Sequence, residues 1–184
     1  MNNYVNTFYQ EMYIEEVYSF ALDEVIKEKQ NELLDKIKGE SAKGSTYNIS
    51  YKLNFYQNIA TLHFTIYVYS GGAHDIRYDE SYYYDLNNGK SLELKDLVTN
   101  EDEFLKKISA LSKEILEKEK KEQIYEDTCL VLDGLKPTKE NFGNIIFESD
   151  ALKIIFPPYQ VGPWSSGEIN IKIPYQAIAD YLKI

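Results

Sequence analysis

The chain has 184 residues, 43% of them hydrophobic and 27% charged, so it is long and apolar enough to form a packed core. Its formal net charge is −10. That charge repels phosphate backbones, and no basic patch offsets it, so nucleic-acid binding is excluded. No run of about 18 apolar residues is present, so we expect no membrane span within this chain.

Cysteine usage and the start of the chain limit the class of protein further. The single cysteine, Cys129, excludes an internal disulfide and a metal site built on cysteines. Its apolar neighbours predict a buried thiol. The first residues, Met1-Asn2-Asn3-Tyr4, lack the basic and apolar regions of a signal peptide. The chain is therefore either intracellular or a protein without its leader.

A long helix is predicted over residues 3–38, because apolar residues recur there at spacings of three and four. Gly39 is a natural end for it, and residues 39–46 are expected to form a flexible loop. The apolar stripe of this helix contains Val5, Phe8, Met12, Tyr13, Val17, Phe20, Ala21, Val25, Ile26, Leu33, Leu34 and Ile37. We expect this stripe to pack across a sheet.

The pattern then changes to strict alternation, which predicts a β-hairpin over residues 47–56 and 59–69 around a tight turn. One face of the second strand is apolar, and the other carries Thr and Tyr side chains. His63 lies on that wetter face, so we expect it to be a surface histidine of the sheet. After a Gly-rich break, a third strand is predicted over residues 76–86, followed by a turn.

The remaining elements are a second helix and three more strands. Asn100 followed by Glu103 resembles a capping box and predicts a helix from there to about residue 122. Two strands are then expected at 142–148 and 151–156. A third follows at 168–173, and a short terminal helix at 175–182.

This order of elements predicts an α+β fold. Its mainly antiparallel sheet would be packed by the long N-terminal helix and the second, central helix. We expect one domain over residues 1–184, made of two halves at residues 1–98 and 99–184. No internal repeat is present.

No phosphate-binding loop, dinucleotide fingerprint, zinc-protease motif or nucleophile elbow is present, and we expect no cofactor. The most enzyme-like group is Ser70, His74, Asp75, Asp79 and Glu80. A histidine beside carboxylates suits a divalent metal or a general base. The same stretch also fits a Gly-rich bulge in which His74 is held by a hydrogen bond. Gly71-Gly72 permits positive φ angles there, and this backbone would position His74.

The stronger candidate is the loop over residues 156–168, which holds three of the five prolines and the only tryptophan. Proline lowers the entropy that a loop loses on binding, and Tyr and Trp are common anchors at interfaces that also stack on sugars. The residues predicted to make contact here are Pro158, Tyr159, Pro163 and Trp164. The alternative is that Tyr159 and Trp164 fill the edge of the core.

Three stretches carry a family resemblance: Tyr69-Ser70-Gly71-Gly72-Ala73-His74, Tyr84 to Leu97 with Gly89-Lys90, and Phe156-Pro157-Pro158-Tyr159-Gln160-Val161-Gly162-Pro163 with Gly167 and Ile171 to Tyr175. With these three stretches in this order, the chain resembles a bacterial extracytoplasmic domain of unknown function. That domain is shared by the lysozyme-binding anti-sigma factor RsiV and the non-catalytic region of the peptidoglycan deacetylase PdaC. The resemblance covers nearly the whole chain.

The resemblance implies a non-enzymatic cell-envelope binding or sensor domain, secreted or membrane-anchored in the full-length protein, with lysozyme or peptidoglycan as its ligand. It implies contacts from Pro158, Tyr159, Pro163 and Trp164, and we expect Gly72 and His74 to add a second contact. The anchor and sigma-binding segment of RsiV and the deacetylase metal motif of PdaC do not occur in this sequence. The alternatives are a metal-dependent envelope enzyme with a site around His74, or a structural spacer.

Overall fold

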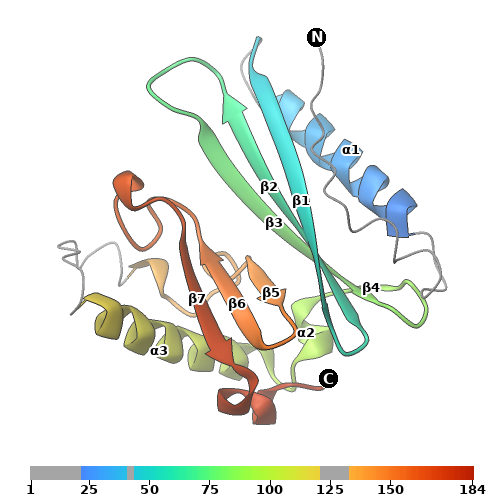
Figure 1. The fold of residues 1–184 in the computed structure, drawn as a ribbon, viewed down its shortest axis with the longest axis vertical. Helices are drawn as coiled ribbons and strands as arrows, with labels where there is room; N and C mark the ends of the chain where they lie inside the picture. Colours follow the sequence, from blue (N-terminus) through green and yellow to red (C-terminus); the bar gives the residue numbers. More distant parts are fainter. Residues whose placement is uncertain (1–21, 41–43, 121–132) are drawn as a thin grey trace.

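The structure is a computed structural model that describes residues 22–40, 44–120 and 133–184. The fold is α+β, as predicted, but its strands form two antiparallel sheets instead of one (Figure 1). The first sheet has the order β1-β2-β3-β4 and the second β5-β6-β7. The strands are β1 (Thr46–Tyr56), β2 (Ile59–Tyr69), β3 (Ile76–Asp85), β4 (Ser91–Leu92), β5 (Ile145–Phe147), β6 (Ala151–Phe156) and β7 (Ile169–Pro174). The helices are α1 (Leu22–Glu40), α2 (Leu94–Leu97) and α3 (Glu101–Lys120), with 3-10 turns η2 (Trp164–Ser166), η3 (Tyr175–Ala177) and η4 (Ala179–Tyr181).

The first core lies between α1 and one face of the first sheet. Ile26, Leu33 and Ile37 on α1 are buried against the apolar face of β2, which confirms the predicted stripe from residue 22 onward. That face consists of Ala60, Leu62, Phe64, Ile66 and Val68. The predicted helix over residues 3–21 and the buried thiol of Cys129 lie outside the described residues.

The register of the first sheet decides which side chains share the face opposite α1. In the β2–β3 pairing, His63 lies opposite Ser81, Thr65 opposite Asp79 and Tyr67 opposite Arg77. Because side chains alternate along a strand, these residues all point away from α1. Strands β2 and β3 are joined by residues 70–75, where Gly71 and Gly72 have φ values of 90° and 126°, as the Gly-rich break predicted.

The second core lies between α3 and the second sheet. Asn100 caps α3 by accepting a hydrogen bond from the Glu103 backbone N–H at 3.1 Å. In the predicted capping box, the Glu103 side chain would also accept a hydrogen bond from the Asn100 backbone N–H. Instead, the Glu103 carboxylate pairs with Lys106 at 2.8 Å. Phe104 and Ile108 on α3 are fully buried within the same cluster as the strand residues Ile145, Phe147, Leu152, Ile154, Phe156, Ile171 and Ile173.

Aromatic side chains join the two sheets. Tyr83 of β3 donates a hydrogen bond from its hydroxyl to the Ile145 carbonyl at 2.9 Å, and its ring meets Phe147 edge-on with centroids 5.6 Å apart. Tyr56 stacks on Tyr175 at 3.9 Å. From this joint the sheets diverge, so that the β2–β3 connection and the loop between β6 and β7 lie at the open end (Figure 1).

The C-terminal segment differs from the single short helix that was predicted. It forms two 3-10 turns, because Ile178 between them has φ −132° and ψ 9°, which is not helical backbone. Leu182 then makes an antiparallel bridge with Val98, which ties the end of the chain to the segment between α2 and α3.

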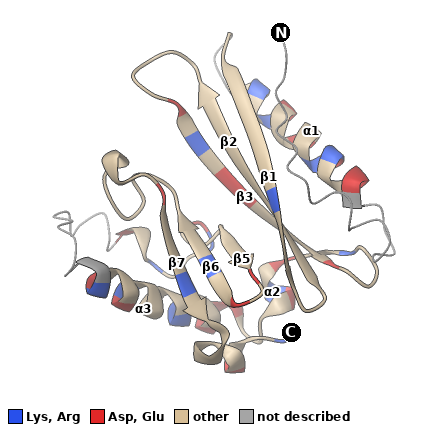
Figure 2. Cartoon of the chain, viewed as in Figure 1, with Lys and Arg blue, Asp and Glu red and all other residues tan. Residues whose placement is uncertain are grey.

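Charged residues of both signs occur along α1 and α3 (Figure 2). No helix in the described part of the chain is long and apolar enough to cross a membrane.

Candidate functional site

A cleft of about 530 Å³ opens where the two sheets diverge. One wall comes from the tip of the β2–β3 hairpin and the other from the loop between β6 and β7. The hairpin contributes Tyr67, Tyr69, Gly72, Ala73, His74, Asp75 and Arg77, and the loop contributes Pro158, Trp164, Ser165, Gly167 and Glu168. The cleft therefore combines exposed aromatic rings with charged groups.

The two walls meet where His74 stacks on Trp164. Their ring centroids are 4.4 Å apart and the rings are inclined by 24°. Trp164 begins the 3-10 turn η2 and remains 44% exposed. The His74 ring also has a backbone contact, since its Nδ1 lies 2.9 Å from the Asp75 carbonyl oxygen. The structure thus brings Gly72, His74, Pro158 and Trp164, predicted from two distant stretches, to one cleft.

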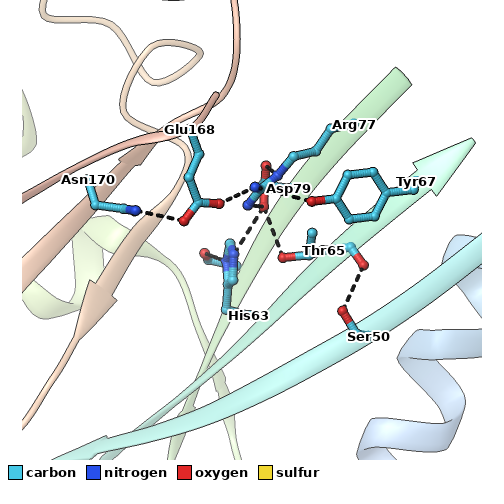
Figure 3. A network of polar contacts seen from close by, with 9 residues as sticks. Ser50, His63, Thr65, Tyr67, Arg77, Asp79, Glu168 and Asn170 are labelled. Carbon is cyan, nitrogen blue, oxygen red and sulfur yellow. Dashed lines mark hydrogen bonds and ion pairs between the residues drawn. The ribbon is translucent and has the colours of Figure 1, made fainter. Parts of the chain in front are cut away.

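An ion-pair network adjoins the cleft and includes two of its lining residues, Arg77 and Glu168 (Figure 3). Arg77 donates from Nε and Nη2 to the two carboxylate oxygens of Asp79, each at 2.7 Å. Its Nη1 pairs with Glu168, which also accepts a hydrogen bond from Asn170 at 2.6 Å. The network therefore joins β3 of the first sheet to the start of β7 in the second. Thr65 adds a hydrogen bond to Asp79 at 3.2 Å.

The network keeps its two carboxylates ionised. Burial alone would raise the pKa of Asp79, whose side chain is fully buried, but contacts with His63 and Arg77 outweigh burial and hold that pKa below its usual range. Burial also opposes ionisation of Glu168, yet Asn170 and Arg77 hold its pKa below the ordinary value. Both groups are therefore negative at neutral pH.

The prediction that His63 is a surface histidine is wrong. The residue is only 2% exposed, because the second sheet covers this face of β2. Its Nδ1 lies 2.9 Å from Ser81 Oγ, and its Nε2 lies 3.2 Å from Asp79 Oδ1. Ser81, His63 and Asp79 thus form a row like a hydrolase triad, but none of them lines the cleft. We therefore interpret these three residues as part of the contact between the two sheets.

Tyr159 occupies a strained position at the tip of the loop. The Gln160 N–H donates to the Pro157 carbonyl at 3.2 Å, which closes a β-turn with Pro158 and Tyr159 at its centre. Tyr159 has a φ of 74°, where glycine is usual, and is 56% exposed. Gln160 anchors the turn through hydrogen bonds from Nε2 to the carbonyls of Gly134 at 3.0 Å and Asn141 at 2.8 Å.

The exposures of Tyr159 and Trp164 test the hypothesis that these side chains fill the edge of the core. With Tyr159 and Trp164 both outside the core, the alternative that they fill the edge of the core is wrong. The spacer hypothesis predicted a fully buried loop, and this loop is partly exposed. Pro163 is also exposed and precedes η2, but neither Pro163 nor Tyr159 lines the cleft.

The enzyme-like group around His74 is dispersed in the structure. Asp79 points into the network between the sheets, whereas Glu80 points to the α1 side, where it pairs with Lys36 at 2.9 Å. Ser70 instead contacts Ser45 at 2.6 Å. Within the described residues, no group of three or more His, Cys, Asp and Glu side chains is arranged to hold a metal ion.

Comparison with known proteins shows that part of the chain is similar to a family of unknown function. Residues 95–176 match the family described as "Protein of unknown function (DUF3298)". The chain is also 31% identical over 166 residues to the peptidoglycan-N-acetylmuramic acid deacetylase PdaC of Bacillus subtilis (strain 168), which confirms the predicted resemblance to a domain shared with PdaC. The match covers 89% of this chain and 35% of PdaC, so the chain spans about a third of that relative's length.

A solved DUF3298 structure has the same fold. The crystal structure of a DUF3298 family protein from Pseudomonas aeruginosa PAO1 superposes with a TM-score of 0.59 at 20% identity, covering 84% of this chain and 68% of that chain. In this chain the loop between β6 and β7 lies within the residues that match the DUF3298 family, and the hairpin tip that completes the cleft precedes them.

Proposed function

We propose that this chain is a non-enzymatic, extracytoplasmic binding domain that holds a glycan strand of the cell envelope in the cleft between the two sheets. The observation that carries this proposal is the row of half-exposed aromatic rings in one cleft: Tyr67, Tyr69 and Trp164. Aromatic rings stack on the apolar faces of sugar rings, and charged groups beside them bind hydroxyls. A relative named for its action on peptidoglycan supports the choice of a wall polymer.

The walls of the cleft are held before any ligand arrives, which supports a binding role. His74 fixes the Trp164 ring by stacking, and Gln160 fixes the other end of the loop by two hydrogen bonds. Arg77 and Glu168 connect the walls at the base of the cleft. A preorganised site loses little conformational entropy on binding, so its contacts contribute more fully to affinity.

Sedimentation with insoluble peptidoglycan tests the proposal. We expect the native chain to sediment with the sacculi and Trp164→Ala to remain in solution. Tyr78→Ala is the matched control, because Tyr78 is 46% exposed on the α1 side of the same sheet and does not line the cleft. If the native chain stays in the supernatant, or if the two variants sediment equally, the glycan proposal is wrong.

A basic protein such as lysozyme is the second candidate ligand, and Tyr159 is the observation that favours it. The ring projects from the tip of an anchored turn and is the most exposed of the large hydrophobic side chains in the described residues. The net charge of −10 would speed the encounter with a basic partner. In calorimetry with lysozyme we expect heat from the native chain and none from Tyr159→Ala combined with Trp164→Ala. Absence of heat from the native chain would remove this candidate.

A further inference from the structure

The charges around the cleft do not balance. Asp75 and Glu168 line the cleft with Arg77, and no lysine is among the lining residues. Arg77 is already bonded to both oxygens of Asp79, which lies directly beneath it. Three carboxylates thus lie in or beside the cleft together with one guanidinium, which pairs with Asp79 and Glu168.

Glu168 is placed to contact a ligand as well as Arg77. Its side chain is 32% exposed, and its two oxygens are shared between Asn170 and Arg77. A carboxylate has about four acceptor sites, so these two bonds leave capacity for a donor from the cleft. Asp75 is exposed on the opposite wall. The exposed rings of Tyr69 and Trp164 line the same cleft, where cation–π attraction would add to the charge pairing.

Building on the proposed function, we propose that the cleft selects sugar units that carry a free, protonated amine over the N-acetylated form of the same units. The aromatic rings would contact the apolar face of either sugar. The ammonium group alone would donate to Asp75 and Glu168, and an N-acetyl group in its place carries no charge to pair with them. The cleft would therefore read the state of N-acetylation of a glycan.

The test is a titration of the whole chain with short β-1,4-linked oligomers of glucosamine and of N-acetylglucosamine, matched in length. Trp164 is the only tryptophan and lines the cleft, so its fluorescence can report binding there. We expect the glucosamine oligomer to bind roughly tenfold more tightly, from two exposed charge pairs and a cation–π contact. Added salt should reduce the difference.

Variants assign the preference to the named carboxylates. Asp75→Asn and Glu168→Gln should each bring the two affinities closer together, because each should weaken binding of the glucosamine oligomer more than binding of the N-acetylated oligomer. Asp75→Asn keeps the pair between Arg77 and Glu168 intact, so it tests the idea even if Glu168→Gln disturbs the fold. Glu103→Gln removes an exposed carboxylate on α3 far from the cleft and should change nothing.

Three results would overturn the preference. The first is equal or tighter binding of the N-acetylated oligomer, with sedimentation on peptidoglycan intact, which would leave the proposed function standing. The second is an equal change in Trp164 fluorescence with pentalysine, which would mean that charge alone suffices and that a basic protein is the better ligand class. The third is no response to either oligomer. Combined with no binding to peptidoglycan, that result would overturn the proposed function as well.

Discussion

The imidazole of His74 stacks on the indole of Trp164 at 4.4 Å, and this contact joins two segments that are far apart in the sequence. His74 follows the glycine pair between β2 and β3, and Trp164 lies between β6 and β7. Each ring restricts the other, although both residues are solvent-exposed. An ordered pair of exposed rings at the mouth of a cleft offers contact area at low entropic cost.

Removing the Trp164 indole should weaken ligand binding and change the free energy of unfolding only slightly. We expect Trp164→Ala to weaken ligand binding at least about tenfold, as for an interface anchor, and to lower the free energy of unfolding by less than about 1 kcal/mol. Urea denaturation and sedimentation with peptidoglycan measure the two effects separately. A large stability loss with unchanged binding would instead assign Trp164 a structural role.

The backbone of Tyr159 is strained, since its φ is 74°, an unfavourable value for a residue other than glycine. Tyr159→Ala removes the ring and keeps the unfavourable backbone, whereas Tyr159→Gly removes both. We therefore expect the glycine variant to be about 1 kcal/mol more stable than the alanine variant, in spite of the greater freedom of glycine in the unfolded chain. Both variants should lose the same binding energy for a protein ligand. Equal stabilities in urea would mean that the turn relaxes to a different backbone.

The loop is anchored to a surface that has no room for another carbon atom. A Cβ on Gly134 would lie 1.9 Å from the Gln160 carbonyl oxygen, which is backbone and cannot rotate away. We expect Gly134→Ala to displace the turn and to destabilise the chain by roughly 1–3 kcal/mol. Gly143→Ala is the control, because its nearest contact there would be 3.4 Å. Similar unfolding midpoints for the two variants would contradict the anchoring of the loop by Gln160.

The local patterns in the sequence were sufficient for the elements and for several turns. Alternation gave the strands, the glycine pair gave the positive φ angles after β2, and Asn100 gave the start of α3. Each of these depends on residues a few positions apart, where backbone sterics and hydrogen bonding act directly.

Features that depend on what packs over a face were not predictable in the same way. The alternation placed His63 correctly among Thr and Tyr side chains but could not reveal that a second sheet covers them. The pairing of Arg77 with Asp79 and Glu168 likewise follows from tertiary contact. One signal was available, since Thr65, Tyr67, Arg77 and Asp79 share a face by parity, and such a polar face is a candidate for a network. Tyr159 at a positive φ had no signal, because glycine is the expected residue there.

Asp79 is the residue on which the network depends most. Its side chain is fully buried and neutralises Arg77, whose side chain is only 11% exposed. Asp79→Asn would leave the guanidinium with Glu168 alone, and removing one partner of a buried pair costs about 3–5 kcal/mol. We expect a loss of this size in urea denaturation. Ser81→Ala, on the same face of β3, removes only the hydroxyl that contacts His63 and should cost about 1 kcal/mol.

The lowered pKa of Asp79 also determines how the stability of the chain should respond to acid. Because the pKa of Asp79 is lower in the folded chain than in the unfolded chain, its contribution is fully present above the unfolded value of about 3.9 and is lost as the pH falls through the folded value. Glu168 acts in the same direction. The native chain should therefore lose stability between pH 5 and lower pH more steeply than Asp79→Asn, which has no proton to take up at this site. Parallel slopes for the two proteins, measured by urea denaturation across that range, would show that the buried pair does not link folding to pH.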